Sequence, residues 1–244
     1  MRVEPFTVGD FIHAYNRGNR KALIFRDVND KWRFLKILRF FNDEYSPHNP
    51  SRQIERNVEV RPQQLLMGEF KWPEWPKSWP PHKPLVKILS YCLKDNHFHL
   101  LLKEIIAGGI SKFMKKLSDG FTGYSNLKYD EVGRVFQGPY KGKTAMKDAK
   151  ILQYLDAYIQ VFNLFEDYPG GIEKTVKEFD QAFELVLNNP FSSLGESFGK
   201  RNLGIIDRDT LKEMFPNLEI YKKFAYDALL VRNIREILGK LTID

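Results

Sequence analysis

The pattern of apolar and polar residues predicts strands in several parts of the chain. Residues 11–15 have the length and composition of a strand. The apolar runs 85–93 and 97–105 are separated by the turn-forming residues 94–96, which predicts an antiparallel hairpin. Residues 133–146 predict a further strand pair, or one strand with a bend.

Apolar residues recur at helical spacing between and after these strands. In residues 28–44, Trp32 and Leu35 begin a three-residue repeat, and Asn29 or Asp30 can cap the start of the helix. The same kind of pattern predicts helices over residues 108–129, 148–165, 175–187, 206–216 and 217–241.

Residues 45–84 interrupt this pattern because they hold most of the prolines and three of the four tryptophans. Proline at this density excludes a regular helix or a central strand, so we expect an inserted loop with one short element near residues 64–67. The tryptophans either attach this loop to the surface or form a platform for unpaired bases. We favour the first interpretation.

The order of elements predicts an α+β fold. A central antiparallel hairpin with interleaved helices favours a ferredoxin-like sheet with helices on one face, followed by a C-terminal helical extension. We expect a first domain over residues 1–175, which includes the insert at 45–84, and a helical extension over residues 176–244.

Composition adds a partner class but does not select it alone. The 244 residues carry a net charge of +7, which is typical of a protein that binds nucleic acid but also of an ordinary basic protein. The single cysteine excludes an internal disulfide and a cysteine-rich zinc site. We find no signal-peptide pattern and no apolar run that could span a bilayer, so we expect a cytoplasmic protein without a membrane partner.

Two histidines and a tyrosine are the candidates for chemistry. His97 and His99 are two apart in a predicted strand, so both side chains point to the same face and could hold a divalent metal ion. A half-buried strand without a metal would show the same pattern. Tyr154 and Tyr158 are four apart and share a helix face, where a phenol beside a metal could attack phosphorus or could simply pack.

Four motifs occur together in an order that resembles a known family. They are FIHAYNRGNRKALIF (11–25), DNHFHLLL (95–102), GRVFQGPYKGK (133–143) and YLDAYIQVFN (154–163). Their order and spacing resemble the REP-associated tyrosine transposases, which are single-tyrosine HUH transposases. The resemblance covers residues 7–170 apart from the insert, and residues 189–207 resemble the segment that follows the family's core.

The resemblance implies a metal-dependent DNA transposase that nicks single-stranded DNA near hairpins. Tyr158 would attack the DNA backbone, form a 5′-phosphotyrosine bond and leave a free 3′-hydroxyl. His97 and His99 would bind magnesium or manganese. The DNA partner would be single-stranded or a hairpin, and the protein would act as a monomer or homodimer.

The chain departs from the family where the third metal ligand is expected. One helical turn after Tyr158 stands Phe162, which cannot bind a metal, while Asn163 is five residues on and Gln160 is two. In a regular helix Asn163 points away from Tyr158. A local widening of the helix would bring it round, so we favour Asn163 over Gln160, and the absence of a third ligand stays an alternative.

Further polar residues are expected to contact DNA. Their charge or hydrogen-bonding capacity suits phosphates, although an ordinary surface role would explain each one alone. They are Arg17, Arg20, Gln137, Tyr140, Lys141 and Lys143. His13 faces either the core or the site, and we favour the core.

Two other functions stay open on the sequence. The fold could belong to a catalytically weak or inactive DNA-binding protein, which the Phe162 departure favours. It could also belong to a metal-dependent hydrolase that uses water in place of tyrosine, although nothing in the sequence beyond the histidine pair favours that function.

Overall fold

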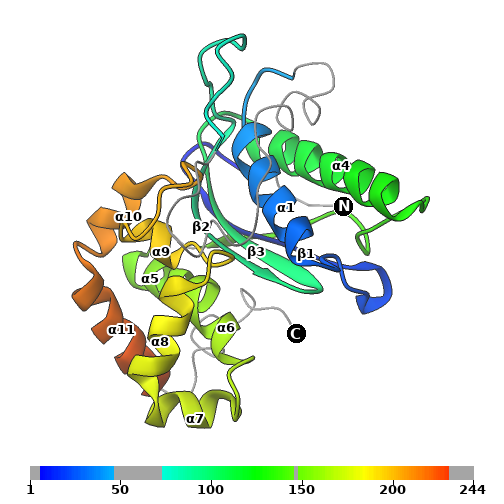
Figure 1. The fold of residues 1–244 in the computed structure, drawn as a ribbon. Coiled ribbons are helices and arrows are strands. Elements are labelled where there is room, and N and C mark those ends of the chain that lie inside the picture. Colours follow the sequence, from blue (N-terminus) through cyan, green and yellow to red (C-terminus); the bar gives the residue numbers. More distant parts are fainter. Residues whose placement is uncertain (1–5, 47–72, 146–147, 231–244) are drawn as a thin grey trace.

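A four-stranded antiparallel sheet lies between two layers of helices in the described part of the chain (Figure 1). The computed structural model describes residues 6–46, 73–145 and 148–230. The strands are β1 (Phe11–Arg17), β2 (Val86–Lys94), β3 (His97–Glu104) and β4 (Lys141–Ala145).

The spatial order of the strands is β2-β3-β1-β4, and every neighbouring pair is antiparallel. Helices follow β1 and β3, so the chain has the β-α-β-β-α-β order of a ferredoxin-like fold. The prediction of an α+β, ferredoxin-like fold is therefore confirmed. The predicted hairpin is β2–β3, with Asp95 and Asn96 at its turn.

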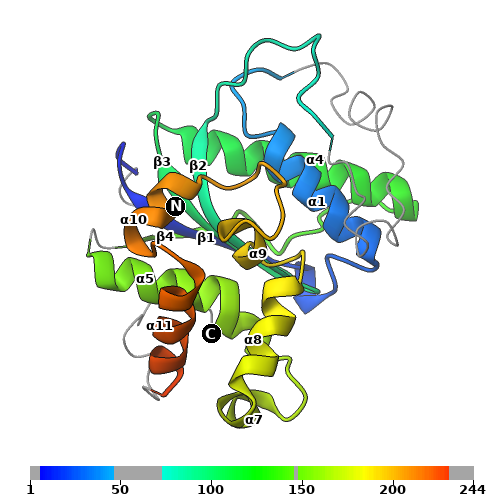
Figure 2. The same ribbon diagram turned by 60° about the vertical axis from the view of Figure 1, so that its left-hand side comes forward.

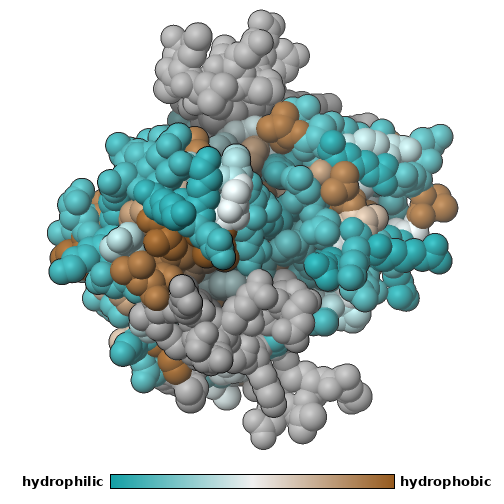
Figure 3. Space-filling model, turned by 90° about the horizontal axis from the view of Figure 1, so that it is seen from below, coloured by the Kyte–Doolittle hydropathy of each residue, from teal (hydrophilic) through white to brown (hydrophobic). Residues whose placement is uncertain are grey.

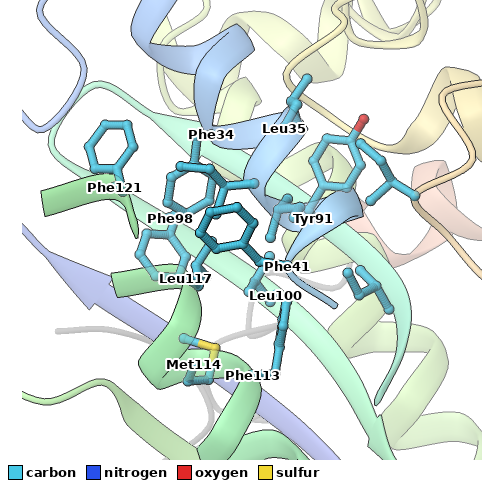
Figure 4. Packing of buried hydrophobic residues seen from close by; sticks show 14 of the residues in the cluster. Phe34, Leu35, Phe41, Tyr91, Phe98, Leu100, Phe113, Met114, Leu117 and Phe121 are labelled. Atoms are coloured by element: carbon cyan, nitrogen blue, oxygen red, sulfur yellow. The ribbon is translucent and has the colours of Figure 1, made fainter. Parts of the chain in front are cut away.

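The first helical layer consists of α1 (Val28–Phe40) and α4 (Gly109–Tyr129), which lie on one face of the sheet (Figure 1). Its core is aromatic and aliphatic, as the rings of Phe34, Phe98 and Phe121 show in Figure 4. The cap of α1 is Asp27, not Asn29 or Asp30 as we expected. Its carboxylate accepts from the backbone of both those residues, and the Asp30 side chain completes a capping box.

The second layer covers the opposite face and is best seen in Figure 2. It begins with α5 (Ala149–Ala157), a π-helical turn (Tyr158–Phe162) and α6 (Asn163–Phe165). It continues with α7 (Gly171–Lys177), α8 (Phe179–Asn188), α9 (Leu194–Ser197), α10 (Arg208–Met214) and α11 (Leu218–Leu230).

The second layer differs in two details from the predicted helices. The helix expected over residues 175–187 is two helices, because Glu178 leaves helical geometry at φ −115° and ψ 35°. The short helix α9 was not predicted. Residue 175, the expected domain boundary, lies within α7, and the division into two domains stays a prediction.

A segment before α9 extends the sheet at its β2 edge. The amide of Leu93 donates to the carbonyl of Phe191 at 2.9 Å, and the amide of Ser193 donates to the carbonyl of Tyr91 at 3.0 Å. Cys92 and Ser192 form an isolated antiparallel bridge. This pairing attaches the C-terminal part of the chain to the strand next to β3.

The described end of the insert is loop, as expected for residues 73–84. The rings of Trp75 and Trp79 pack against Phe40, at centroid distances of 5.9 and 6.2 Å, and Trp79 is buried. These two indoles therefore attach the loop to the first layer. The short element expected near residues 64–67 lies outside the described residues.

The surface seen in Figure 3 is mostly hydrophilic, with separate apolar patches. Among the described residues, none of the helices combines the length and the apolar character that crossing a bilayer requires.

Candidate active site

Strands β1 and β3 bring histidines together on the face that the second layer covers. Side chains alternate along each strand, and Tyr15 pairs with His99 while Arg17 pairs with His97. His13 lies on the same face, and its Nε2 is 2.9 Å from Nδ1 of His99. We expected His13 in the core; it is buried, but it is in contact with the candidate metal ligand.

The ring of Tyr158 lies against these histidines. Its centroid is 5.7 Å from that of His99 and 6.2 Å from that of His13, with the rings nearly perpendicular in both pairs. The rings of His97 and His99 are 5.0 Å apart. The three side chains selected from the sequence thus converge, and Tyr158 is only 4% exposed.

The π-helical turn explains how Asn163 reaches Tyr158. Its backbone N–H donates to the carbonyl of Tyr158, a bond that spans five residues instead of four. Its side-chain Nδ2 donates to the same carbonyl at 2.8 Å. The local widening that would bring Asn163 round towards Tyr158 is therefore present, and the end of the turn is buried.

Gln160, the other candidate ligand, is engaged elsewhere. Its Nε2 donates to Asp156 Oδ2 at 2.6 Å, and its Oε1 accepts from the hydroxyls of Ser193 and Ser197 at 2.9 and 3.0 Å. Both ends of the amide are thus occupied within the second layer, which argues against Gln160 as a third ligand, and Asn163 as that ligand stays a prediction.

The two histidines suit a divalent ion. His97 Nδ1 donates to Asn96 Oδ1 at 2.6 Å, which leaves the lone pair on its Nε2. His99 Nε2 is buried and has no hydrogen-bond partner among the described residues. A proton on His99 Nδ1, donated to His13, likewise leaves a lone pair on Nε2. Ligating histidines commonly hold their second ring nitrogen in this way.

Burial keeps both imidazoles in the form that binds metals. It lowers the pKa of His97 to about 4, helped by the nearby charges of Lys94 and Arg17. It also lowers the pKa of His99 far below its ordinary value. A histidine binds a metal ion through its neutral imidazole, so these lowered pKa values favour binding. Across residues 6–46, 73–145 and 148–230, no group of three His, Cys, Asp or Glu residues could hold a metal, so a third protein ligand would be an amide such as Asn163.

Cationic side chains lie around this site. The ammonium groups of Lys141 and Lys143, on the edge strand β4, are 6.0 and 5.4 Å from the centre of the Tyr15 ring. Lys94 is buried, and its Nζ is 2.5 Å from both the Asn163 carbonyl and Asp167 Oδ2. The charge of Lys94 is thus paired with Asp167, so the positive charge on this face that favours a phosphate-bearing ligand comes from Lys141 and Lys143.

The remaining predicted DNA contacts are less uniform. Arg20 is exposed in the turn after β1, with the left-handed φ of 53° that non-glycine residues seldom adopt. Gln137 is exposed, and its backbone N–H donates to the Arg17 carbonyl. Tyr140 instead packs against the first-layer core, and its hydroxyl is 3.3 Å from Ser111 Oγ on α4. The structure therefore does not place Tyr140 beside the histidines.

Several residues of the site were not selected from the sequence. Lys94 is the last residue of β2 and contacts Asn163, and Asn96 lies in the hairpin turn and contacts His97. Tyr15 lies on the same face of β1 as His13, and this could have been predicted because side chains two residues apart on a strand point to the same face. The contacts of Lys94 could not be predicted in this way, because they depend on how β2 packs against the second layer.

Comparisons with known proteins add one structural similarity. No protein-family model matches the sequence, and no curated protein matches it. A solved structure described as "Structure of the REP associates tyrosine transposase bound to a REP hairpin" has a TM-score of 0.43 and 14% identity. The match covers 86% of this chain and 88% of that chain. A similarity at this level carries no argument about activity, which has to come from the side chains of the site.

Proposed function

We propose that the protein cleaves and rejoins single-stranded DNA through Tyr158, assisted by a divalent ion. The observation that carries this proposal is the position of the Tyr158 ring, 5.7 Å from His99 on a face lined with cations. His97, His99 and Asn163 would hold magnesium or manganese.

The residues of this site suit an in-line attack on a backbone phosphate. The Tyr158 hydroxyl would form a bond to phosphorus while the bond to the 3′ oxygen breaks, which leaves a 5′-phosphotyrosine and a free 3′-hydroxyl. Lys141 and Lys143 would hold the phosphate. A bound divalent ion would withdraw charge from the phosphate and so assist a phenol that is a weak nucleophile at neutral pH.

The covalent bond to Tyr158 would conserve the energy of the phosphodiester. A 3′-hydroxyl could then attack the phosphotyrosine and rejoin the strand without ATP. Single-stranded DNA is the substrate that the sequence motifs imply. A neighbouring hairpin is the further partner that the sequence motifs imply.

The histidines and the tyrosine come from the same chain. The site therefore needs no second copy to bring these side chains together, which supports activity as a monomer. A homodimer stays an alternative.

A DNA-binding protein without the reaction is the second candidate. The observation in its favour is the burial of Tyr158, because its hydroxyl must become accessible before it can attack. The cations around Tyr15 would still hold phosphates in such a protein.

An adduct assay separates these functions. The protein is incubated with end-labelled single-stranded DNA that contains a hairpin, in the presence of Mn²⁺, and resolved on a denaturing gel. We expect a covalent band that Tyr158→Phe and His99→Ala both abolish. Tyr154→Phe is the matched control, because Tyr154 lies on the same helix but packs against Phe224.

Each outcome selects one function. Tight binding without an adduct would support the binding protein. Cleavage that persists in Tyr158→Phe would instead indicate a hydrolase that uses water.

A further inference from the structure

The buried amide of Gln160 occupies the middle of the π-helical turn. Besides its bonds to Asp156, Ser193 and Ser197, its backbone carbonyl accepts from the Ser192 hydroxyl at 2.8 Å. The turn is thus attached on its far side to the segment that precedes and forms α9. None of these residues is among the expected ligands or nucleophile apart from Gln160, whose amide is occupied.

The serines are in turn attached to the sheet. The amide of Tyr91 on β2 donates to Ser193 Oγ at 3.0 Å, and that hydroxyl donates to Gln160 Oε1 at 2.9 Å. One side chain therefore connects the backbone of β2 with the π-helical turn. Since β2 pairs directly with β3, the same contacts hold the turn in position relative to the strand that carries His97 and His99.

A π-helical turn needs such support because its hydrogen bonding is unfavourable compared with that of an α-helix. Single π turns persist where surrounding structure holds them, and they are frequent at functional sites. At the other end of this turn, Lys94 Nζ contacts the Asn163 carbonyl at 2.5 Å. The turn is therefore held from both β2 and the α9 segment.

We propose that Gln160, Ser192, Ser193 and Ser197 are positioning residues that lock the π-helical turn and so hold Tyr158 against the histidines. This inference rests on the proposed function in taking Tyr158 as the nucleophile. It makes the segment 189–197 part of the apparatus for strand transfer, although none of its residues would touch DNA.

The test reports on the tyrosine directly. A single 3-fluorotyrosine is incorporated at position 158 of the full chain, and its ¹⁹F NMR signal is recorded without DNA or metal. The variant is Ser193→Ala combined with Ser197→Ala, which removes both hydroxyls from Gln160. The matched control is Thr175→Val, which removes a buried hydroxyl from the same layer. That hydroxyl donates to the carbonyl of Ile172 in its own helix.

We expect one narrow signal in the parent and in Thr175→Val, and a shifted, split or broadened signal in the double variant. In the adduct assay the double variant should react about 10- to 100-fold more slowly, because a small displacement of a reacting group has effects of this size. Its affinity for uncleaved DNA should not change.

A double variant with an unchanged signal and an unchanged rate would overturn the inference, and so would a lowered melting temperature with the signal unchanged. If the parent forms no adduct but the signal still changes in the double variant, the positioning role stands and the proposed function fails. Should the double variant not fold, Ser197→Ala alone, which retains the Ser193 bond, must show the same change at smaller amplitude.

Discussion

At the scale of single residues, the proposed metal ligands depend on partners that hold the histidine rings. Asn96 accepts from His97 Nδ1 and so fixes which nitrogen faces the site. Loss of such a partner commonly lowers metal affinity about 10- to 100-fold. We therefore expect Asn96→Ala to bind Mn²⁺ more weakly by that factor, measured by the concentration at which Mn²⁺ raises the melting temperature.

The control for this prediction is Asn126→Ala, on α4, whose side chain donates to the Gly133 carbonyl on the other side of the sheet. Mn²⁺ should stabilise this variant as it does the parent, and should not stabilise His99→Ala. Equal stabilisation of His99→Ala would place the ion elsewhere.

Asp156 gives the protein an unusual dependence of stability on pH. Burial raises the pKa of its carboxyl to about 6, against 3.8 for the ordinary group, although the hydrogen bond from Gln160 opposes this rise. Between these values the folded state binds the proton and the unfolded state releases it. Stability from this group is therefore present at low pH and is lost as the pH rises to about 6.

The size of this loss follows from the shift, at 1.36 kcal/mol per pKa unit, and is about 3 kcal/mol. The lowered pKa of His97 acts in the opposite direction over nearly the same range, because there the unfolded state binds the extra proton. We therefore compare the parent with Asp156→Asn, in which the histidines are unchanged and the amide oxygen can still accept from Gln160.

Urea unfolding at about pH 4 and about pH 7 measures the difference in free energy between these two proteins. The parent should lose about 2 to 2.5 kcal/mol relative to Asp156→Asn between the two conditions, because part of the loss has already occurred at about pH 4. A difference that stays constant with pH would mean that Asp156 titrates normally in the folded protein.

At this scale, the sequence could assign a residue to the site only where a local pattern pointed to it. His97 and His99 share a strand face by alternation alone, and Tyr158 follows from its motif. His13 could not be assigned, because alternation defines two faces of β1 without saying which one meets the second layer. Asp156 gave no signal either, since its burial results from contacts with distant segments.

At the scale of elements, the π-helical turn could be anticipated from the sequence, but the contacts that stabilise it could not. A ligand role for Asn163, five residues after Tyr158, would need a widened helix, and the structure has one. Its stabilising contacts could not be predicted, because they come from Ser192, Ser193 and Ser197, more than thirty residues later in the chain.

The edge strand β4 carries a prediction about DNA binding. Lys141 and Lys143 lie over the Tyr15 ring on the face of the site, and each phosphate contact to a single strand contributes about 0.7 to the slope of log affinity against log salt. Lys141→Ala with Lys143→Ala should therefore weaken binding and reduce that slope by about 1.4, measured by fluorescence anisotropy between low and moderate salt.

The matched control is Lys112→Ala with Lys115→Ala, two exposed lysines on α4 across the sheet from the histidines. The slope should stay at the parent value in this variant. An equal reduction in both double variants would indicate that net charge, and not the face of the sheet, attracts DNA.

At the scale of the whole molecule, the order and direction of the strands were predictable because a central hairpin with interleaved helices allows few arrangements. The covering of the second face was not. Helical periodicity shows that a segment has an apolar side, but it does not say against which surface that side packs. The helices after α5 thus belong to the same layer as the tyrosine, which only the structure shows.

This shared layer predicts how the chain unfolds. The second apolar cluster joins Leu89 and Leu101 of the sheet with Phe183 and Tyr221 of the C-terminal helices. Loss of those helices would expose one face of the sheet on which the first layer also depends. We therefore expect one cooperative transition for both layers, instead of separate transitions for residues 1–175 and 176–244.

All four tryptophans lie between residues 32 and 79, so their fluorescence follows mainly the N-terminal part, although the ring of Trp32 is also 5.1 Å from that of Phe191. Far-UV circular dichroism follows mainly the helices of both layers. Thermal unfolding curves from the two signals should coincide. If the helical signal fell before the tryptophan signal, the helices after residue 175 would be a separate unit. Tyr158 would then be held by a layer that can detach from the histidines without unfolding the sheet.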